Sequence, residues 1–256
     1  MNRPHLFEFI DLEWWPRVLR NLETDALQSS LERTYDRVAP KLAEVIEQTG
    51  NDDIIDLCSG ASGPWPHLIE ILKEKDIDVD VKLTDKFPNQ SAIARLRERP
   101  VSGLHYLEDS VPADKVPEKL TGLRTMFSGF HHLRPEEAHL VLKDAAEKRQ
   151  AICIFDGVSA RDSIGSFLLL LIIPPIVLTF MFLLSFTIKP TTGTRILFHT
   201  LIPIVPIVMA WDAAVSLTRA YKRSEMEELT SKIQVPGYSW EIGKVQEISY
   251  LVGHPG

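Results

Sequence analysis

The sequence contains little cysteine and no excess of positive charge. Only two of its 256 residues are cysteine, Cys58 and Cys153, and their spacing is not typical of a metal site. We therefore expect reduced thiols in a reducing compartment. The formal net charge is −7 at pH 7, whereas a nucleic-acid partner would require a basic face. The composition therefore argues against nucleic-acid binding.

The chain also lacks internal repeats and the features of a signal peptide. Acidic residues occur within the first thirteen positions, where a signal peptide would have basic and apolar zones. The sequence therefore predicts a protein made in the cytoplasm. A length of 256 residues suits one large α/β domain better than two complete domains.

One short stretch joins an apolar strand to a turn of very small residues. Residues 54–57 form an apolar run that includes Asp56 and fits a buried parallel strand. The turn after it contains Cys58, Ser59, Gly60, Ala61, Ser62 and Gly63. Small residues let the backbone approach a ligand closely, and helical spacing follows from Trp65 onward. The order of strand, turn and helix predicts a nucleotide-like ligand at the carboxyl end of a sheet.

Further predicted strands alternate with helical segments. Residues 79–85 alternate apolar and polar positions and end at Asp85, a carboxylate that can accept hydrogen bonds from both ribose hydroxyls. Other strands are predicted near residues 104–107, 125–130 and 151–156. This alternation predicts a mostly parallel sheet with helices on both faces.

In this order, the motifs resemble those of the class I S-adenosylmethionine-dependent methyltransferases. The resemblance covers roughly residues 50–160 and the segments after residue 210. Residues 56–63 are similar to the family's first motif, although Cys58 and Ser62 stand where glycine is commoner. Residues 129–133 resemble the motif that faces the transferred methyl group.

The resemblance implies a Rossmann-like α/β fold with a seven-stranded, mostly parallel sheet, and S-adenosylmethionine as the cofactor. Asp85 would hold the ribose, and Asp109 would lie beside the adenine ring. The positions that we expect to bind the cofactor are Asp56, Ser59, Gly60, Ser62, Gly63, Asp85, Lys86, Asp109, Ser110, Ser128 and Phe130.

A methyl acceptor that reacts through a hydroxyl needs a base to take its proton. His131 and His132, after the fourth predicted strand, are the candidate catalytic residues because histidine titrates near neutral pH. We expect no metal site at His132, Glu136 and His139. Pro135 should open a helix, so His132 would lie before it and the helical spacing would fail.

Two long apolar stretches follow the fifth predicted strand. Residues 166–188 contain no charge, and residues 196–211 form a second stretch. A bilayer span needs about 20 apolar residues, so only the first stretch is long enough. Two spans would also carry Lys189 and Arg195 to the far side of the membrane, against the positive-inside tendency. We therefore expect residues 166–211 to form an apolar helical hairpin that contacts a membrane from the cytoplasmic side without crossing it.

The alternative is that this hairpin covers a greasy substrate pocket, and both readings predict a lipophilic substrate. A basic rim at Arg219, Lys222 and Arg223 is expected at anionic headgroups. The candidate substrate contacts are the aromatic and polar residues Trp14, Trp15, Trp65, Asp212, Arg219 and Tyr221.

The chain divides into four predicted segments. These are an N-terminal helical lid (1–48), a cofactor-binding core (49–160), an apolar hairpin insertion (161–223), and a last helix with two closing strands (224–256). The sequence thus predicts a methyltransferase that acts on a lipophilic small molecule or lipid at a membrane surface.

Two other classes of function stay open. One is a membrane-anchored scaffold that binds the cofactor without catalysis. The other is an NAD(P)-dependent Rossmann oxidoreductase, which is less favoured because the chain has no Tyr-x-x-x-Lys pair. The sequence does not indicate the acceptor or the oligomeric state.

Overall fold

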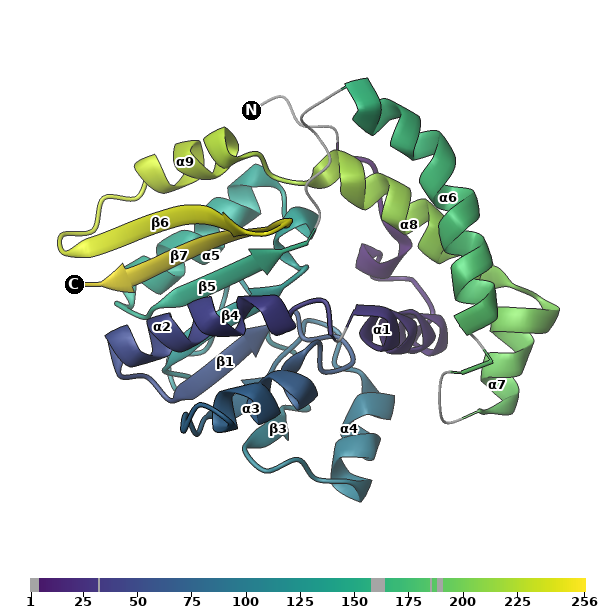
Figure 1. Ribbon diagram of the computed structural model, residues 1–256, viewed down its shortest axis with the longest axis horizontal. Coiled ribbons are helices and arrows are strands. Elements are labelled where there is room, and N and C mark those ends of the chain that lie inside the picture. Colours follow the sequence, from purple (N-terminus) through teal and green to yellow (C-terminus); the bar gives the residue numbers. More distant parts are fainter. Residues whose placement is uncertain (1–4, 32, 158–163, 185, 188–190) are drawn as a thin grey trace.

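One seven-stranded sheet forms the centre of the molecule (Figure 1). The computed structural model describes residues 5–31, 33–157, 164–184, 186–187 and 191–256. The strand order is β3-β2-β1-β4-β5-β7-β6, with β7 antiparallel to both of its neighbours and the first five strands parallel. The strands are β1 (Asp53–Leu57), β2 (Asp80–Leu83), β3 (Leu104–Tyr106), β4 (Leu123–Phe127), β5 (Ile152–Asp156), β6 (Tyr238–Val245) and β7 (Ile248–Pro255). The predicted seven-stranded, mostly parallel sheet is confirmed.

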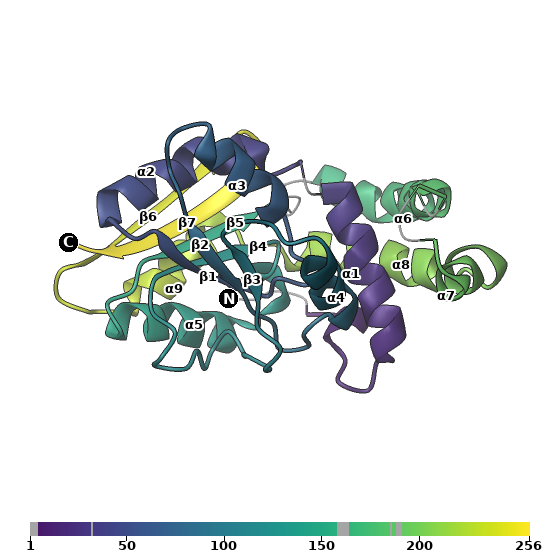
Figure 2. The same ribbon diagram turned by 90° about the horizontal axis from the view of Figure 1, so that it is seen from below.

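Helices cover both faces of the sheet (Figure 2). Successive side chains of a strand point to opposite faces, so Ile54 packs in the apolar core on one side and Ile55 in the core on the other. The first core contains residues of α2 and α3, and the second contains residues of α5 and α9. These helices are α2 (Ala39–Thr49), α3 (Trp65–Lys73), α5 (Pro135–Glu147) and α9 (Arg223–Ser231), and α4 (Gln90–Glu98) follows β2.

Proline and glycine set the ends of the helices before β1. Pro40 stands in the first turn of α2, where its missing N–H costs nothing. Gly50 ends α2 in the left-handed conformation, with φ of 63°. The preceding helix, α1, begins at Arg17 and ends at Leu31. Its first turns are helical because Leu19 and Leu22 are buried against other apolar side chains.

A group of apolar helices lies beyond α1 (Figures 1 and 2). The group contains α6 (Ile164–Leu184), α7 (Gly193–Ile196), a π-helical turn (Leu197–Leu201) and α8 (Ile204–Arg219). Helix α6 lies beside α8, and α1 stands between this group and the sheet. We call the buried apolar residues at this junction the α1–α8 cluster: Trp15, Leu19, Leu22, Ala26, Met181, Val205, Val208 and Met209.

The expected membrane hairpin over residues 166–211 stays a prediction. Residues 161–163 and 188–190, with Lys189, lie outside the described residues. Among the described residues, no single helix is both long and apolar enough to cross a membrane. Residues Gly193–Leu201 and Ile204–Arg219 meet the length and composition criteria only together, and they are bent by 64° at their junction.

Candidate active site

The turn after β1 adopts a backbone conformation that most residues avoid. Cys58, Gly60, Ser62 and Gly63 have φ angles of 58°, 52°, 109° and 54°. Glycine adopts such angles readily, whereas a residue with a Cβ atom is strained there. Cys58 and Ser62 therefore hold the turn in shape at some cost in energy, as residues at ligand sites often do.

Hydrogen bonds of the Asp56 and Ser59 side chains hold this turn in place. The buried Asp56 carboxylate accepts hydrogen bonds from Ser59 Oγ (2.6 Å) and Thr125 Oγ1 (2.7 Å). Burial raises the pKa of Asp56 to about 7. Ser59 Oγ in turn accepts from the backbone N–H of Thr84 (3.1 Å). The two residues predicted to touch the cofactor thus tie the turn to β2 and β4.

Asp85 connects the turn after β1 with the loop after β2. Its Oδ2 accepts from the backbone N–H of Gly60 (2.8 Å), and its Oδ1 accepts from that of Phe87 (2.7 Å). Burial raises the pKa of this carboxyl. Each carboxylate oxygen has a second lone pair. Asp85 can therefore shape the turn and accept further hydrogen bonds from a ligand.

The loops after β2 and β3 meet at the same edge of the sheet. Ser110 Oγ donates to the carbonyl of Lys86 (2.7 Å). Lys86 is exposed and pairs with Glu13 near the N-terminus (3.1 Å). Asp109 precedes Ser110 and is exposed. The structure thus brings Asp85, Lys86 and Ser110 together, with Asp109 in the adjoining loop.

A histidine and an aspartate meet at the carboxyl ends of β4 and β5. His131 lies in a short 3-10 turn (Phe130–His132) that follows β4, and Asp156 is the last residue of β5. The Nδ1 atom of His131 lies 2.9 Å from Asp156 Oδ2, which also accepts from the backbone N–H of His131 (3.1 Å). Both side chains are buried. A carboxylate at Nδ1 fixes the tautomer in which Nε2 is the basic nitrogen.

His132 has different electrostatic surroundings. Its Nδ1 lies 2.8 Å from Asp11 Oδ1 and 3.3 Å from Glu8 Oε2. Burial alone would lower the pKa of His132, but the charges of Glu8 and Asp11 and the hydrogen bond with Asp11 outweigh burial and raise the pKa to about 10. His132 is therefore charged at neutral pH. A charged imidazole accepts no proton, so the structure disfavours His132 as the base that the sequence allowed.

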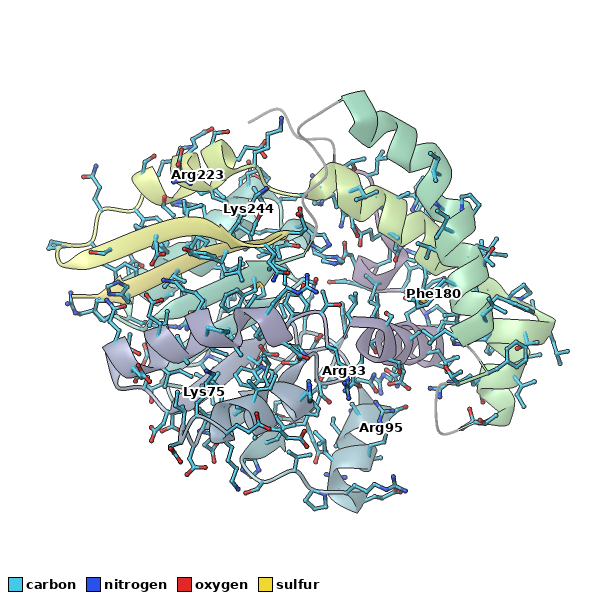
Figure 3. The ribbon with its side chains drawn as sticks, viewed as in Figure 1. Arg33, Lys75, Arg95, Phe180, Arg223 and Lys244 are labelled. Atoms are coloured by element: carbon cyan, nitrogen blue, oxygen red, sulfur yellow. The ribbon has the colours of Figure 1, made fainter. Side chains whose placement is uncertain are left out.

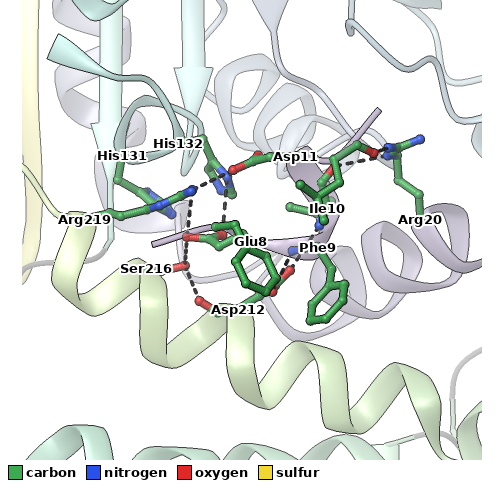
Figure 4. A network of polar contacts seen from close by, with 12 residues as sticks. Glu8, Phe9, Ile10, Asp11, Arg20, His131, His132, Asp212, Ser216 and Arg219 are labelled. Atoms are coloured by element: carbon green, nitrogen blue, oxygen red, sulfur yellow. Dashed lines mark hydrogen bonds and ion pairs between the residues drawn. The ribbon is translucent and has the colours of Figure 1, made fainter. Parts of the chain in front are cut away.

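Helix α8 holds the N-terminal segment, residues 6–11, beside the histidines (Figure 4). The buried Arg219 donates from Nη1 to Asp11 Oδ2 (2.6 Å), lies 3.1 Å from Glu8 Oε1, and donates from Nε to the Leu6 carbonyl (2.8 Å). Asp212 accepts from the backbone N–H groups of Phe9 (2.9 Å) and Ile10 (3.2 Å). These contacts close the N-terminal segment onto the end of the sheet.

Arg219 and Asp212 are therefore internal supports in this structure. Arg219 was predicted to contact the substrate and to belong to a basic rim that faces lipid headgroups. In the structure its guanidinium forms ion pairs with Glu8 and Asp11. Burial raises the pKa of Asp212 to about 7. Glu8, Asp11 and Asp156 were not predicted from the sequence. The sequence shows only that Glu8 and Asp11 are acids near the N-terminus and that Asp156 is an acid at the end of a strand.

The predicted aromatic contacts separate into four environments. Trp65 is fully buried in the core, with its ring against Phe127. Trp15 is buried in the α1–α8 cluster, whereas Trp14 is exposed. The remaining two of this kind are buried together: Phe130 packs on Tyr221, whose hydroxyl donates to the Leu133 carbonyl (2.9 Å).

Three more of the predicted cofactor positions, Ser128, Ser62 and Gly63, lie at this end of the sheet. Ser128 has a φ of 51°, and its hydroxyl bonds the hydroxyl of the buried Tyr35. Ser62 is buried within the turn, and Gly63 has no atom within 4 Å of the position where a Cβ would stand. The turn therefore borders open space at Gly63, as a cradle for a ligand requires.

The two histidines and Glu8 could together bind a cation. Ligand atoms of Glu8, His131 and His132 all lie within 4.8 Å of one another. The Arg219 guanidinium, 3.1 Å from Glu8, already supplies positive charge there. Pro135 does open α5, so His132 lies outside the helix that carries His139. The absence of a metal stays a prediction.

Comparison with known proteins rests on solved structures. No protein-family model and no curated protein matches the chain. The plantazolicin methyltransferase BpumL in complex with SAH is 12% identical, with a TM-score of 0.54, 94% of this chain covered and 96% of that one. Human N-acetylserotonin methyltransferase in complex with SAM is 9% identical, with a TM-score of 0.51, 90% of this chain covered and 55% of that one.

A third structure extends this likeness. An O-methyltransferase family protein from Burkholderia thailandensis is 12% identical, with a TM-score of 0.50 and 91% of this chain covered. This chain spans only 59% of that protein's length. Identities this low establish the fold alone, and the strand order agrees with it. The chain has the fold of the class I S-adenosylmethionine-dependent methyltransferases.

Proposed function

We propose that the protein is an S-adenosylmethionine-dependent methyltransferase that acts on a lipophilic small molecule or lipid. One observation carries this proposal. The turn at Gly60, its partner Asp85 and the His131–Asp156 pair all lie at the carboxyl edge of one parallel sheet. Ligands of such sheets bind at that edge. The proposal is supported by neighbours of the same fold that carry SAM or SAH.

The residues at this edge suit the proposed cofactor. Asp85 has lone pairs for the ribose hydroxyls, and Asp109 and Ser110 lie in the next loop, on the proposed adenine side. The open space at Gly63 leaves room for the methionine part. Helix α1 reaches the same turn, because Thr24 Cγ2 lies 3.4 Å from the Cβ position of Gly60. Residues 6–11 and α1 thus form the proposed lid.

The bound cofactor supplies an electrophilic methyl group, and the chain's own residues supply position and proton transfer. His131 takes the proton of an acceptor hydroxyl at Nε2, while Asp156 holds the ring in the required tautomer. The lid excludes water from the reacting groups. The charged His132 holds the lid through Glu8 and Asp11 and takes no part in proton transfer.

The exposed apolar side chains of α6 to α8 favour two further parts of the proposal: a lipophilic acceptor and contact with the cytoplasmic face of a membrane. A large exposed apolar patch marks an interaction site more often than chance. Among the described residues, large apolar side chains are exposed in and just after α6, at Ile172, Ile176, Leu178, Phe180, Phe182, Leu183 and Phe186, and from α7 to α8, at Ile196, Leu197, Leu201, Ile202, Ile207 and Trp211 (Phe180 is labelled in Figure 3).

Cofactor titration tests the proposal. Calorimetry should show binding of S-adenosylhomocysteine and none of NAD or NADP. Binding of a nicotinamide cofactor instead would favour an oxidoreductase and end the proposal. Incubation of the protein with labelled methyl donor and extracted membrane lipids should then give a product heavier by one methylene unit. Cofactor binding without any labelled product would favour a non-catalytic scaffold.

A further inference from the structure

Tyr35 joins the two strand ends that carry the His131–Asp156 pair. It lies between α1 and α2 and is buried. Its hydroxyl oxygen accepts from the backbone N–H of Gly157 (3.3 Å) and also bonds the hydroxyl of Ser128. Ser128 directly follows β4, and Gly157 directly follows β5. One buried side chain from the N-terminal part of the chain thus contacts the residue after each strand.

Both contacts adjoin the two side chains that are proposed to take the proton. Gly157 follows Asp156 in the chain, so its N–H belongs to the peptide group that the Asp156 carbonyl forms. On the other strand, Ser128 opens the short segment that leads from β4 to His131. The Tyr35 hydroxyl therefore fixes the backbone on both sides of the hydrogen bond between His131 and Asp156.

Packing holds the Tyr35 hydroxyl itself in one place. The ring of Tyr35 packs edge-on against Phe127, the last residue of β4, with ring centroids 5.2 Å apart. Burial, followed by the charge of Asp156, raises the pKa of Tyr35, so the phenol keeps its proton and can donate as well as accept. Ser128 has a φ of 51°, which is strained for a residue with a Cβ atom, and the bond to Tyr35 helps to hold it there. A side chain locked by packing in this way can keep a neighbouring site in one geometry.

We propose that Tyr35 is a positioning residue, whose hydroxyl holds the backbone after β4 and β5 so that Asp156 keeps the His131 ring in one tautomer and one orientation. Tyr35 acts through Gly157 and Ser128, and proton transfer stays with His131. The role of His131 as a base rests on the proposed function. The positioning of its ring can be measured without any ligand.

The proton on Nδ1 of His131 reports on this positioning. Nuclear magnetic resonance of the protein with isotope-labelled histidine detects that proton, and the variant His131→Gln identifies its signal by the loss of it. Tyr35→Phe keeps the ring and removes only the hydroxyl. In this variant the proton should exchange with water about 3- to 10-fold faster, the range for one net hydrogen bond. Ser128→Ala, which removes one of the two contacts of Tyr35, should change the exchange rate in the same direction.

Tyr238→Phe is the matched control, which separates positioning from a general loss of stability. The Tyr238 hydroxyl donates to the backbone carbonyl of Gln150 (2.7 Å), which precedes β5 at the opposite end of the sheet. Both tyrosine variants should unfold at lower urea concentration, but only Tyr35→Phe should speed the exchange at His131. An unchanged rate in Tyr35→Phe, or the same increase in both variants, would overturn the proposal. Absence of the Nδ1 proton signal from the wild-type protein would also overturn it.

Turnover separates this inference from the proposed function. With the acceptor found in the lipid extracts, Tyr35→Phe should lower kcat by about 3- to 10-fold and leave KM unchanged, because the hydroxyl aligns the base and does not bind the acceptor. Unchanged kcat in a wild-type protein that does transfer the methyl group would overturn the positioning role alone. Faster exchange at His131 in Tyr35→Phe, in a protein that does not bind S-adenosylhomocysteine, would instead confirm the positioning and end the proposed function.

Discussion

At the scale of single residues, His131 and His132 stand side by side in different electrostatic surroundings. Their ring centroids are 4.4 Å apart, yet His131 faces Asp156 and His132 faces Glu8 and Asp11. Only the neutral tautomer of an imidazole can take a proton. The difference comes from the N-terminal segment, whose two carboxylates keep His132 charged.

Replacement of each histidine separates the two roles. His131→Ala should lower kcat by about 10²- to 10⁴-fold, the usual contribution of a general base, and should leave S-adenosylhomocysteine affinity unchanged. His132→Gln should retain most of the turnover because it removes a positive charge and no base. Both are measured with the acceptor found in the lipid extracts. Full turnover in His131→Ala would exclude His131 as the base.

The charged state of His132 predicts how stability depends on pH. The pKa of His132 is about 10 in the folded protein and 6.5 in its ordinary state. A raised histidine pKa gives stability that is complete below about pH 6.5 and is lost as the pH rises through about 10. The free energy of unfolding in urea should therefore fall across this window. The carboxyl groups of Asp56 and Asp212, whose pKa values are raised to about 7, change the unfolding free energy mainly below this pH window.

The variant His132→Gln checks this assignment. Its unfolding free energy should fall less than that of the wild-type protein between about pH 6.5 and about pH 10. His105→Gln, with a side chain 60% exposed, serves as the control and should follow the wild-type curve. Identical slopes for His132→Gln and the wild-type protein would show that another group titrates.

Asp85 is the residue on which cofactor affinity should depend most. Asp85→Ala should weaken S-adenosylhomocysteine binding by about 1.5 to 3 kcal/mol, the scale for a hydrogen bond to a charged group. It also releases the N–H of Gly60 and so loosens the turn. Asp80→Ala, at the opposite end of β2, is the matched control and should bind normally. Calorimetry with equal affinities for both variants would remove Asp85 from the site.

At the scale of elements, the N-terminal segment and α8 form one unit through Arg219. This guanidinium is 2% exposed and serves the 1% exposed Glu8 as well as Asp11. Burial alone would raise the pKa of Asp11, but His132 and Arg219 hold it well below its usual range. Arg219 of α8 and His132 thus share the two carboxylates of this segment, and Asp212 of α8 binds its backbone.

Loss of the Arg219 cation should destabilise the protein. Arg219→Gln removes one of the two cations that pair with Glu8 and Asp11 and leaves only His132, which should cost about 1 to 3 kcal/mol of unfolding free energy. Arg223→Gln, which removes an exposed ion pair with Glu227, should cost less than about 1 kcal/mol. Urea unfolding measures both variants. Similar small losses would mean that the N-terminal segment contributes little to the fold.

The elements differ in how far the sequence could predict them. Asp85 and His131 were found because strand ends are set by local patterns, and parallel strands bring their carboxyl ends to one edge. Glu8 and Asp11 were not found, because their partner Arg219 is 208 residues away from Asp11 and no local pattern encodes that contact. The core position of Trp65 could not be predicted, because helical spacing shows that one face is buried and does not show what covers it.

At the scale of the whole molecule, the exposed apolar helices favour contact with a membrane, whereas the net negative charge opposes contact with anionic lipids. The net charge of −7 opposes approach to anionic lipids, and Arg219 is not available to a headgroup. The exposed apolar residues of α6 to α8 still favour transfer out of water, at about 25 cal/mol per Å² of apolar area. Membrane contact should therefore depend on apolar burial and not on anionic lipid.

Vesicle flotation tests this balance. The wild-type protein should float with vesicles of phosphatidylcholine alone, and added phosphatidylserine should not increase binding. Leu183 and Leu201, 60% and 70% exposed, lie on the proposed membrane face. The double variant Leu183→Ser, Leu201→Ser should bind vesicles at least about 10-fold more weakly because it removes two buried apolar side chains from the contact.

Leu140→Ser is the matched control for this experiment. Leu140 is also exposed but lies on α5, away from the apolar helices, so its replacement should leave flotation unchanged. All variants should bind S-adenosylhomocysteine equally, because none of these residues contacts the cofactor edge. If the wild-type protein stays unbound, or if both variants float alike, the apolar helices serve another purpose, and a lipophilic acceptor would have to reach the proposed active site from water.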